Sequence, residues 1–376
     1  MSDPTQPIRG RGASTNIQNR FEKLGYVADP DSEEIMDPGR PPTDFFRDKT
    51  KTAISYNDSP DIGFGASINP YRGCEHGCIY CYARPTHEYL GWSAGLDFES
   101  RIMVKEDAPA LLRRELASKK WEPQCLAMSG VTDCYQPIER KLRLTRRILE
   151  VLAEFRNPVG IVTKNRLVAR DIDVLQELAK YQCAVVFVSV TTLDLSLNRI
   201  LEPRTSSPAQ RLETIQELAE AGVPVGAMTA PIIPGLNDHE IAPLIQAVAK
   251  AGAKYAGHTV LRLPWAVAPL FERWLEEHYP DRKEKILNRI RDIRGGKLYN
   301  AEFGERMVGS GPFADQIHTM FKIACGKAGI NKARPPISTK HFHRPTFVGD
   351  QFYLFGDEDS KREAPEEYKR GFTIDG

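Results

Sequence analysis

The sequence has no long apolar run, almost no net charge and few cysteines. No stretch approaches about 20 consecutive apolar residues, so we expect no transmembrane helix. Basic residues number 51 and acidic residues 50, which gives a formal net charge of +1. No global field therefore indicates a nucleic-acid partner, and any such partner would need a local patch. The first residues, Met1 to Pro7, lack the apolar core of a secretory signal, and we expect a cytoplasmic protein.

Seven cysteines are present, and three of them stand together at Cys74, Cys78 and Cys81. This pattern is not a disulfide framework. Three thiolates on one short loop can hold three corners of a cubane iron–sulfur cluster and leave the fourth iron open to an exchangeable ligand. Structural metal sites usually take all four ligands from the protein. The alternative is a zinc site completed by His76 or His87.

The other cysteines do not form a second cluster motif. Cys125, Cys183 and Cys325 are isolated in apolar surroundings, where a thiol behaves as a small buried residue. We therefore expect them to be structural, and we expect no auxiliary iron–sulfur centre.

Short apolar runs alternate with helix-like segments from about residue 66 onward. We expect strands at 66–70, 125–128, 159–163, 184–190, 223–229 and 255–263. Helices are expected near 107–119, 138–155, 170–180, 208–221 and 238–251, with more helix between 266 and 294. This alternation is typical of an α/β fold with a parallel sheet. Since the repeats are too few for an eight-stranded barrel, they indicate a partial (β/α)6 barrel.

The chain divides by composition into a core and two extensions. Residues 1–60 mix Pro, Gly, Asp and Arg and are expected to form an extended or partly disordered arm. The core barrel is expected at 61–300, a C-terminal extension at 301–355 and a disordered charged tail at 356–376. Within the core, Asn237 and Glu240 resemble a capping box. Gly222 and Gly252 are placed as helix C-caps.

Polar residues follow several of the expected strands. Ser129 to Asp133 end the second strand, Thr163-Lys-Asn ends the third and Ser189 ends the fourth. In α/β barrels, chemistry gathers where the carboxyl ends of the strands converge. We therefore expect these side chains to face the cysteine loop, which follows the first strand.

The cysteine loop resembles the cluster motif of the radical S-adenosylmethionine (SAM) superfamily, C-x3-C-x-aromatic-C, with Tyr80 at the aromatic position. The resemblance covers roughly residues 64–265. It implies a [4Fe–4S] cluster whose open iron binds SAM, and reductive cleavage of SAM to a 5′-deoxyadenosyl radical that abstracts hydrogen from a substrate. Reduced ferredoxin or flavodoxin would supply the electron. The alternative to an enzyme is a regulator that binds the cluster and has no catalytic activity.

The resemblance also implies roles for residues outside the loop. Ser129, Thr132 and Asp133 stand where the superfamily contacts the methionine amino group of SAM. Ser189 is placed to reach the ribose hydroxyls. Arg204 lies in Leu201-Glu-Pro-Arg-Thr, a segment resembling one in which a charged side chain holds the SAM carboxylate. A guanidinium can bind a carboxylate through two hydrogen bonds.

Three segments resemble the spore photolyase branch of the superfamily: 132–139, 201–205 and 231–235. That branch carries a hydrogen-donating cysteine just before the position of Thr132, where this chain has Gly-Val. The nearest thiol is Cys134, for which we weigh a hydrogen-atom donor against a buried, inert residue. Tyr135 is a candidate relay on the same grounds. The blocks starting at Gly91 and Thr163 also resemble uncharacterised bacterial radical SAM proteins, which name no substrate.

The substrate expected from this branch is nucleic acid that carries a damaged base, and the alternative is a small molecule or a protein or peptide. A basic patch could contact phosphates or form an ordinary solvated helix face; it comprises Arg140, Lys141, Arg143, Arg146 and Arg147. Near the C-terminus, Gln351 to Phe355 resemble the short motif that docks on the bacterial sliding clamp. The alternative is a segment that folds back on the barrel.

Overall fold

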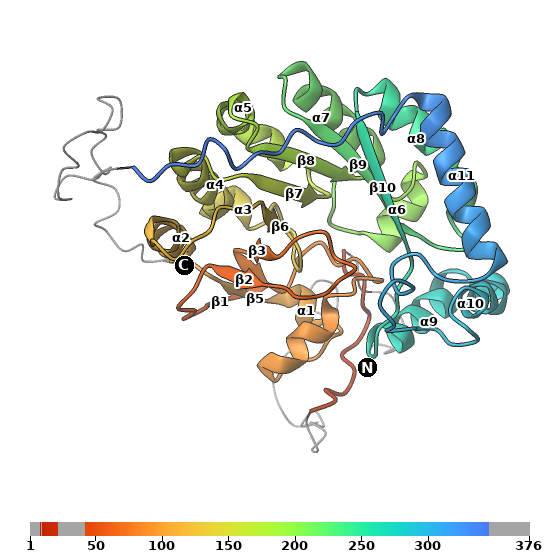
Figure 1. Cartoon of the computed structure of the whole chain (residues 1–376). Coiled ribbons are helices and arrows are strands. Elements are labelled where there is room, and N and C mark those ends of the chain that lie inside the picture. The colour runs from red at the N-terminus through yellow and green to blue at the C-terminus, as the bar shows by residue number, and fades with distance from the viewer. Residues whose placement is uncertain (1–7, 9, 22–41, 346–376) are drawn as a thin grey trace, which may run out of the picture.

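The fold is a mixed α/β arrangement around one seven-stranded sheet (Figure 1). The computed structural model describes residue 8, residues 10–21 and residues 42–345. The sheet has the order β10-β9-β8-β7-β6-β3-β2, and β2 (Ile54–Tyr56) pairs antiparallel with β3 at one edge. The other strands are parallel: β3 (Ala66–Ile68), β6 (Leu126–Met128), β7 (Val159–Thr163), β8 (Ala184–Ser189), β9 (Val225–Ile232) and β10 (Tyr255–Val260).

All the parallel strands expected from the sequence are present, each shifted by a few residues at most, and they lie side by side in chain order. The α/β class is therefore confirmed. The sheet is open in the part of the chain that the structure describes, because β10 and β2 form its two edges. Helices connect the strands and cover one face of the sheet (Figure 1): α2 (Ala108–Ala117), α3 (Glu139–Leu142), α4 (Leu144–Phe155), α5 (Ile172–Lys180), α7 (Pro208–Glu220) and α8 (Ile241–Lys250).

The helix expected at 138–155 is divided in two. Arg143 has a φ of 49°, a left-handed conformation that interrupts the helix between α3 and α4. The carboxylate of Glu139, fully buried, accepts hydrogen bonds from the backbone N–H groups of Leu144 and Thr145 at 3.0 Å each. Since the first N–H groups of a helix have no partner within it, this contact starts α4 anew. The sequence pattern did not reveal it because Glu139 acts from outside the helix.

A second, three-stranded sheet was not predicted. It has the order β1-β5-β4 and consists of β1 (Asp44–Arg47), β5 (Arg101–Val104) and β4 (Tyr71–Arg72). The residues expected to form the N-terminal arm thus supply one strand to each sheet, β1 here and β2 in the larger sheet. A 3₁₀ helix, η1 (Arg84–Leu90), and the short α1 (Asp97–Ser100) connect the cysteine loop to β5.

After β10 the chain adds helices outside the repeat. They are α9 (Val267–His278), α10 (Lys283–Asp292) and α11 (Pro312–Ala328). Another helix outside the repeat, α6 (Leu195–Leu201), lies between β8 and α7. Residues 330–345 then run across the amino ends of the strands, seen in blue in Figure 1. Backbone N–H groups of Asn331 and Ser338 donate to carbonyls of Lys254 and Gln182 at 3.0 and 2.9 Å. No helix among the described residues is long and apolar enough to cross a membrane.

The ends of several helices show which of the predicted caps form. Gly222 and Gly252 have φ values of 75° and 104°, so both C-cap predictions are confirmed. The capping box at Asn237 is wrong, because the Asn237 side chain accepts a hydrogen bond from the backbone of Ile233 at 2.6 Å and does not cap a helix. A capping box occurs instead at Ser207 and opens α7.

Candidate cluster and cofactor site

The cysteine loop brings three free thiols together at the carboxyl end of β3. Cys74 and Cys78 are buried and Cys81 is partly buried. Burial is the main cause that raises the pKa of Cys78, and the charges of neighbouring groups, the other two thiols included, raise it further. Burial and the charge of Cys74 likewise raise the pKa of Cys81. A bound metal reverses this preference, because coordinated thiols lose their protons. Three free thiols that influence one another on one loop fit a cluster held by three cysteines.

Two glycines let this loop turn sharply. Gly73 and Gly77 have φ values of 82° and 66°, which favour glycine. A Cβ on Gly73 would lie 2.9 Å from the ring of His87, and one on Gly77 would lie 2.7 Å from a carboxylate oxygen of Glu99. Side chains at either position would therefore push the loop away from its support.

A fully buried ion pair supports the loop from behind. Arg84 and Glu99 have no exposed side-chain surface, and Arg84 Nη2 donates to Glu99 Oε1 at 2.5 Å. The same guanidinium donates to the backbone carbonyl of Cys78 at 3.0 Å. Glu99 also accepts the backbone N–H groups of Gly12 and Ala13, each at 2.9 Å. One ion pair thus fastens the cysteine loop and an N-terminal segment to each other.

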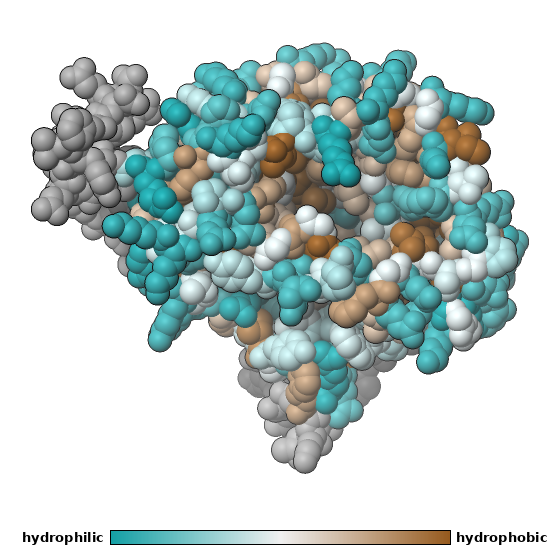
Figure 2. All heavy atoms as spheres, viewed as in Figure 1, coloured by the Kyte–Doolittle hydropathy of each residue, from teal (hydrophilic) through white to brown (hydrophobic). Residues whose placement is uncertain are grey.

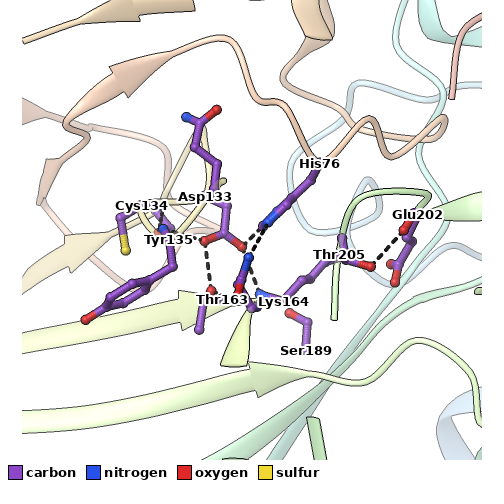
Figure 3. A network of polar contacts seen from close by, with 12 residues as sticks. His76, Asp133, Cys134, Tyr135, Thr163, Lys164, Ser189, Glu202 and Thr205 are labelled. Carbon is purple, nitrogen blue, oxygen red and sulfur yellow. Dashed lines mark hydrogen bonds and ion pairs between the residues drawn. The ribbon is translucent and has the colours of Figure 1, made fainter. Parts of the chain in front are cut away.

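At the end of β6, Asp133 connects the loop to the sheet (Figure 3). One carboxylate oxygen accepts from Thr163 Oγ1 at 2.8 Å, and the other accepts the backbone N–H of Lys164 at 2.8 Å and lies 3.3 Å from His76 Nδ1. Burial opposes both charges, but the pair raises the pKa of His76 and lowers that of Asp133. The buried ring of His76 also faces Cys74, which raises the pKa of His76 further.

A second buried carboxylate, Glu202, lies on the other side of the loop. The Tyr80 hydroxyl donates to Glu202 Oε1, and Thr191 donates to the same oxygen at 2.7 Å. Arg211 donates to Oε2 at 2.5 Å from a side chain that is also buried. Burial opposes the charge of Glu202, but Arg211 holds its pKa down at about 2. The predicted cofactor contact Tyr80 is thus oriented by Glu202.

Lys164 is the charged residue of the site that the sequence analysis did not single out. Its ammonium lies 5.9 Å from the Tyr80 ring centroid and lowers the pKa of Cys78 and of Glu202. It forms no ion pair with any carboxylate in the described part of the chain. Figure 3 shows Lys164 next to Ser189, at the end of β8. The Thr163-Lys-Asn block at a strand end was the available signal.

Several predicted cofactor contacts already have partners within the protein. Ser129, with a φ of 72°, accepts the backbone N–H of Cys134 at 2.9 Å. Thr132 is buried and donates to the carbonyl of Tyr71 at 2.8 Å. Among this set, only Ser189 keeps a hydroxyl for which no partner occurs in the described structure, although its carbonyl accepts from Arg211.

The structure also places Arg204 differently from the prediction. Its guanidinium donates to Glu75 Oε1 at 2.9 Å, and its backbone N–H donates to the carbonyl of His76. Because Glu75 is buried and lies in the cysteine loop, Arg204 supports that loop.

Cys134 and Tyr135 lie in the core and not at the mouth of the site. Both have no exposed surface and belong to the main hydrophobic cluster. Burial raises the pKa of each well above its usual value. The Tyr135 hydroxyl donates to Asp171 at 3.1 Å. These contacts argue against the hydrogen-transfer roles. The phenol at the mouth is Tyr82, 48% exposed, whose hydroxyl donates to the carbonyl of Gly130 at 2.5 Å.

The histidines considered for a zinc site are engaged elsewhere. His76 contacts Asp133 through Nδ1 and Asn165 through Nε2 at 3.2 Å. His87 Nε2 lies 2.9 Å from the carbonyl of Arg101. Among residues 10–21 and 42–345, no three Cys, His, Asp or Glu side chains converge on one metal ion. A cubane cluster requires no such convergence, because its cysteines bind different irons.

Ion pairs divide the basic patch. Arg146 pairs with Asp173 at 2.6 Å and with Glu150 at 2.8 Å, so this side chain stabilises α4 and its neighbours. Arg140, Lys141 and Arg143 are exposed and form no ion pair with described residues. The cations available to a ligand are therefore those that precede α4.

Comparison with known proteins gives consistent matches. Residues 68–248 match the family model described as the radical SAM superfamily. An uncharacterised protein from Mycobacterium tuberculosis is 36% identical over 236 residues, which is 62% of this chain and 68% of that protein. An uncharacterised protein from Methanocaldococcus jannaschii is 32% identical over 244 residues, 64% of this chain and 86% of the relative.

Solved structures share the fold. Spore photoproduct lyase complexed with dinucleoside spore photoproduct superimposes with a TM-score of 0.54, covering 76% of this chain and 80% of that one at 18% identity. A mutant of the same lyase with bound AdoMet and dinucleoside spore photoproduct gives a TM-score of 0.53 at 19% identity. At this identity the likeness concerns the fold alone.

Proposed function

The chain belongs to the radical SAM superfamily, and on this basis we propose that it cleaves SAM at a [4Fe–4S] cluster held by Cys74, Cys78 and Cys81. When bound, the cluster and SAM supply a 5′-deoxyadenosyl radical that abstracts hydrogen from a substrate. The chain is thus a radical SAM enzyme, and we infer that its open sheet is a partial (β/α)6 barrel. The observation that carries the proposal is the group of three free thiols on one supported loop.

We assign the remaining roles from the contacts of each side chain. Lys164 would bind the SAM carboxylate, since it is a partly buried ammonium without an acidic partner. Ser189 would bind a ribose hydroxyl. Asp133 and Glu202 act as positioning residues, because they fix His76 and Tyr80 around the loop. Reduced ferredoxin or flavodoxin is the expected electron donor.

The test is anaerobic reconstitution of the cluster, followed by reduction in the presence of SAM. We expect 5′-deoxyadenosine to form, and we expect Cys78→Ala to abolish both the iron–sulfur absorbance and the product. Cys183→Ala is the matched control, because Cys183 is a buried free cysteine outside the loop. An intact cluster that never yields 5′-deoxyadenosine would contradict the proposal.

For the substrate, we propose nucleic acid carrying a damaged base. The exposed cations Arg140, Lys141 and Arg143 precede α4 and follow Ile138, whose backbone N–H donates to Glu75 of the cysteine loop at 2.7 Å, and they are available to phosphates. The solved lyase with the shared fold was complexed with a dinucleoside photoproduct. Deuterium transfer from labelled DNA lesions into 5′-deoxyadenosine would support this substrate. Transfer from no nucleic acid would contradict it.

One feature favours a small molecule as the second candidate. An open pocket of about 660 Å³ lies between β8–β10 and residues 331–335, and it is lined by Phe187, Met228 and Tyr255 among others. Cavities of this size are usual for small-molecule ligands. Under this alternative, Phe187→Trp would reduce turnover, whereas loss of the cations before α4 would not.

The sliding-clamp proposal concerns Gln351 to Phe355, which lie outside the described residues. A peptide spanning these residues should bind the clamp at tens of micromolar or better, and Phe355→Ala should abolish binding. Absence of binding by the wild-type peptide would end the proposal.

A further inference from the structure

Exposed aromatic rings gather around one guanidinium near the cysteine loop. Arg20, Phe21, Tyr89, Trp265 and Tyr299 form this group, which we term the aromatic platform. The guanidinium carbon of Arg20 lies 4.4, 4.7 and 5.6 Å from the ring centroids of Trp265, Phe21 and Tyr89. The Tyr299 ring lies 5.9 Å from Trp265. Phe21, Tyr89 and Trp265 are 55%, 73% and 58% exposed.

The backbone at Trp265 is unfavourable for a tryptophan. Its φ is 42°, in the left-handed region that bulky residues rarely adopt. The conformation does not bury the indole, which remains more than half exposed, whereas Trp274 in the following helix is almost fully buried. Strained residues cluster at ligand sites, and the indole, which contacts Arg20 and Tyr299, keeps more than half of its surface free for a partner from outside the chain.

Arg262, three residues before Trp265 in the chain, lies beside the cysteine loop. Its guanidinium lies 5.4 Å from the ring of Tyr82, the residue after Cys81. One nitrogen donates to the sulfur of Met307 at 3.1 Å, and the buried Nε has no partner. In the described structure Arg262 forms no ion pair. Burial and the charge of Arg262 lower the pKa of Arg294 to about 10, so two cations stand close together here.

We propose that the aromatic platform and Arg262 bind an unpaired stretch of nucleic acid, with bases stacked on Trp265 and Tyr89 and a backbone phosphate on Arg262. Aromatic rings bind any unpaired base through its face, and a duplex hides these faces. The guanidinium of Arg262, which has no acidic partner among the described residues, suits a phosphate oxygen. Arg20 is not counted as a phosphate ligand because it pairs with Glu88 at 3.0 Å. This inference rests on the proposed nucleic-acid substrate and narrows it to single-stranded or locally unpaired strands.

The test is equilibrium binding of the cluster-loaded protein to a fluorescent 12-nucleotide single strand, compared with the same sequence as a duplex. SAM and reductant are omitted, so binding is measured independently of SAM cleavage. We expect Trp265→Ala and Tyr89→Ala each to weaken single-strand binding about tenfold, and Trp265→Phe to retain most of the affinity. Arg262→Gln should weaken binding and reduce the slope of log affinity against log salt by about one.

Tyr56→Ala is the matched control. Tyr56 lies on β2 and is 73% exposed, like Tyr89, but it has no place in the platform. Equal affinities for the wild type, Trp265→Ala and Tyr56→Ala would overturn the inference. Tighter binding of the duplex than of the single strand, or binding of an acidic protein in place of the oligonucleotide, would also overturn it. SAM cleavage without oligonucleotide binding would refute this surface alone, and binding without cleavage would refute the proposed function alone.

Discussion

Substituting Glu99 by Gln should detach the support beneath the cysteine loop. The change keeps the side-chain volume but leaves the fully buried guanidinium of Arg84 without its carboxylate. Breaking one side of a buried pair costs about 3–5 kcal/mol. The amide nitrogen of Gln also cannot accept a hydrogen bond, so one of the two backbone N–H groups, that of Gly12 or that of Ala13, loses its acceptor, and a buried donor without a partner costs about 1–3 kcal/mol. Because the two costs arise at one site, they do not simply add, and we expect Glu99→Gln to lower the free energy of unfolding by about 5 kcal/mol, the upper end of the range for a broken buried pair.

The assay is urea denaturation of the metal-free protein, with iron and sulfide content after reconstitution as a second measurement. Glu154→Gln is the matched control, since the Arg113–Glu154 pair has the same 2.5 Å separation but side chains that are 25% and 26% exposed. An ion pair exposed in this way contributes about 1 kcal/mol or less to the free energy of unfolding. We expect Glu99→Gln to lose several times more stability than Glu154→Gln and to retain less cluster. Equal losses in the two variants would refute the reasoning.

Three further predictions concern single residues. Lys164→Met should weaken SAM binding, measured by calorimetry, roughly tenfold or more, because a charge-assisted contact is worth about 1.5–3 kcal/mol. Gly12→Ala should reduce cluster retention, since its Cβ would lie 1.8 Å from the carbonyl oxygen of Gly77. Burial, and secondarily His318, lower the pKa of His258 to about 4, so the unfolded state binds more protons below pH 6.5. Thermal stability should therefore fall between pH 6.5 and pH 4, on the order of 1 kcal/mol, and His258→Phe should reduce this dependence.

Each of these has a control. Lys164→Arg keeps the charge and should recover part of the SAM affinity. Gly10→Ala introduces a Cβ that meets nothing within 4 Å, although its φ of 76° strains the backbone, so cluster loss equal to that of Gly12→Ala would contradict the steric argument. An unchanged pH profile in His258→Phe would assign the acid sensitivity to other groups.

Local patterns predicted the repeating part of the fold because they are short-range. Strands such as 184–190 are apolar on both faces, as a covered parallel sheet requires, and the glycines after α7 and α8 mark helix ends by their backbone freedom. The second sheet was missed because β1, β4 and β5 are short and their pairings join residues more than thirty positions apart in the chain. No window of sequence contains both partners.

The sequence by itself determined the chemistry, since the spacing of the three cysteines is a property of the covalent chain that folding does not change. Only the tertiary structure decided which polar residues face that loop. Asp133, Cys134 and Tyr135 are adjacent in the chain, yet the first contacts His76 and the others are buried in the core. The direction of a side chain after a strand depends on the turn that follows, and on long-range partners that spacing cannot specify. For the same reason the sequence could not show that Arg204 pairs with Glu75, whereas Lys164 forms no ion pair among the described residues.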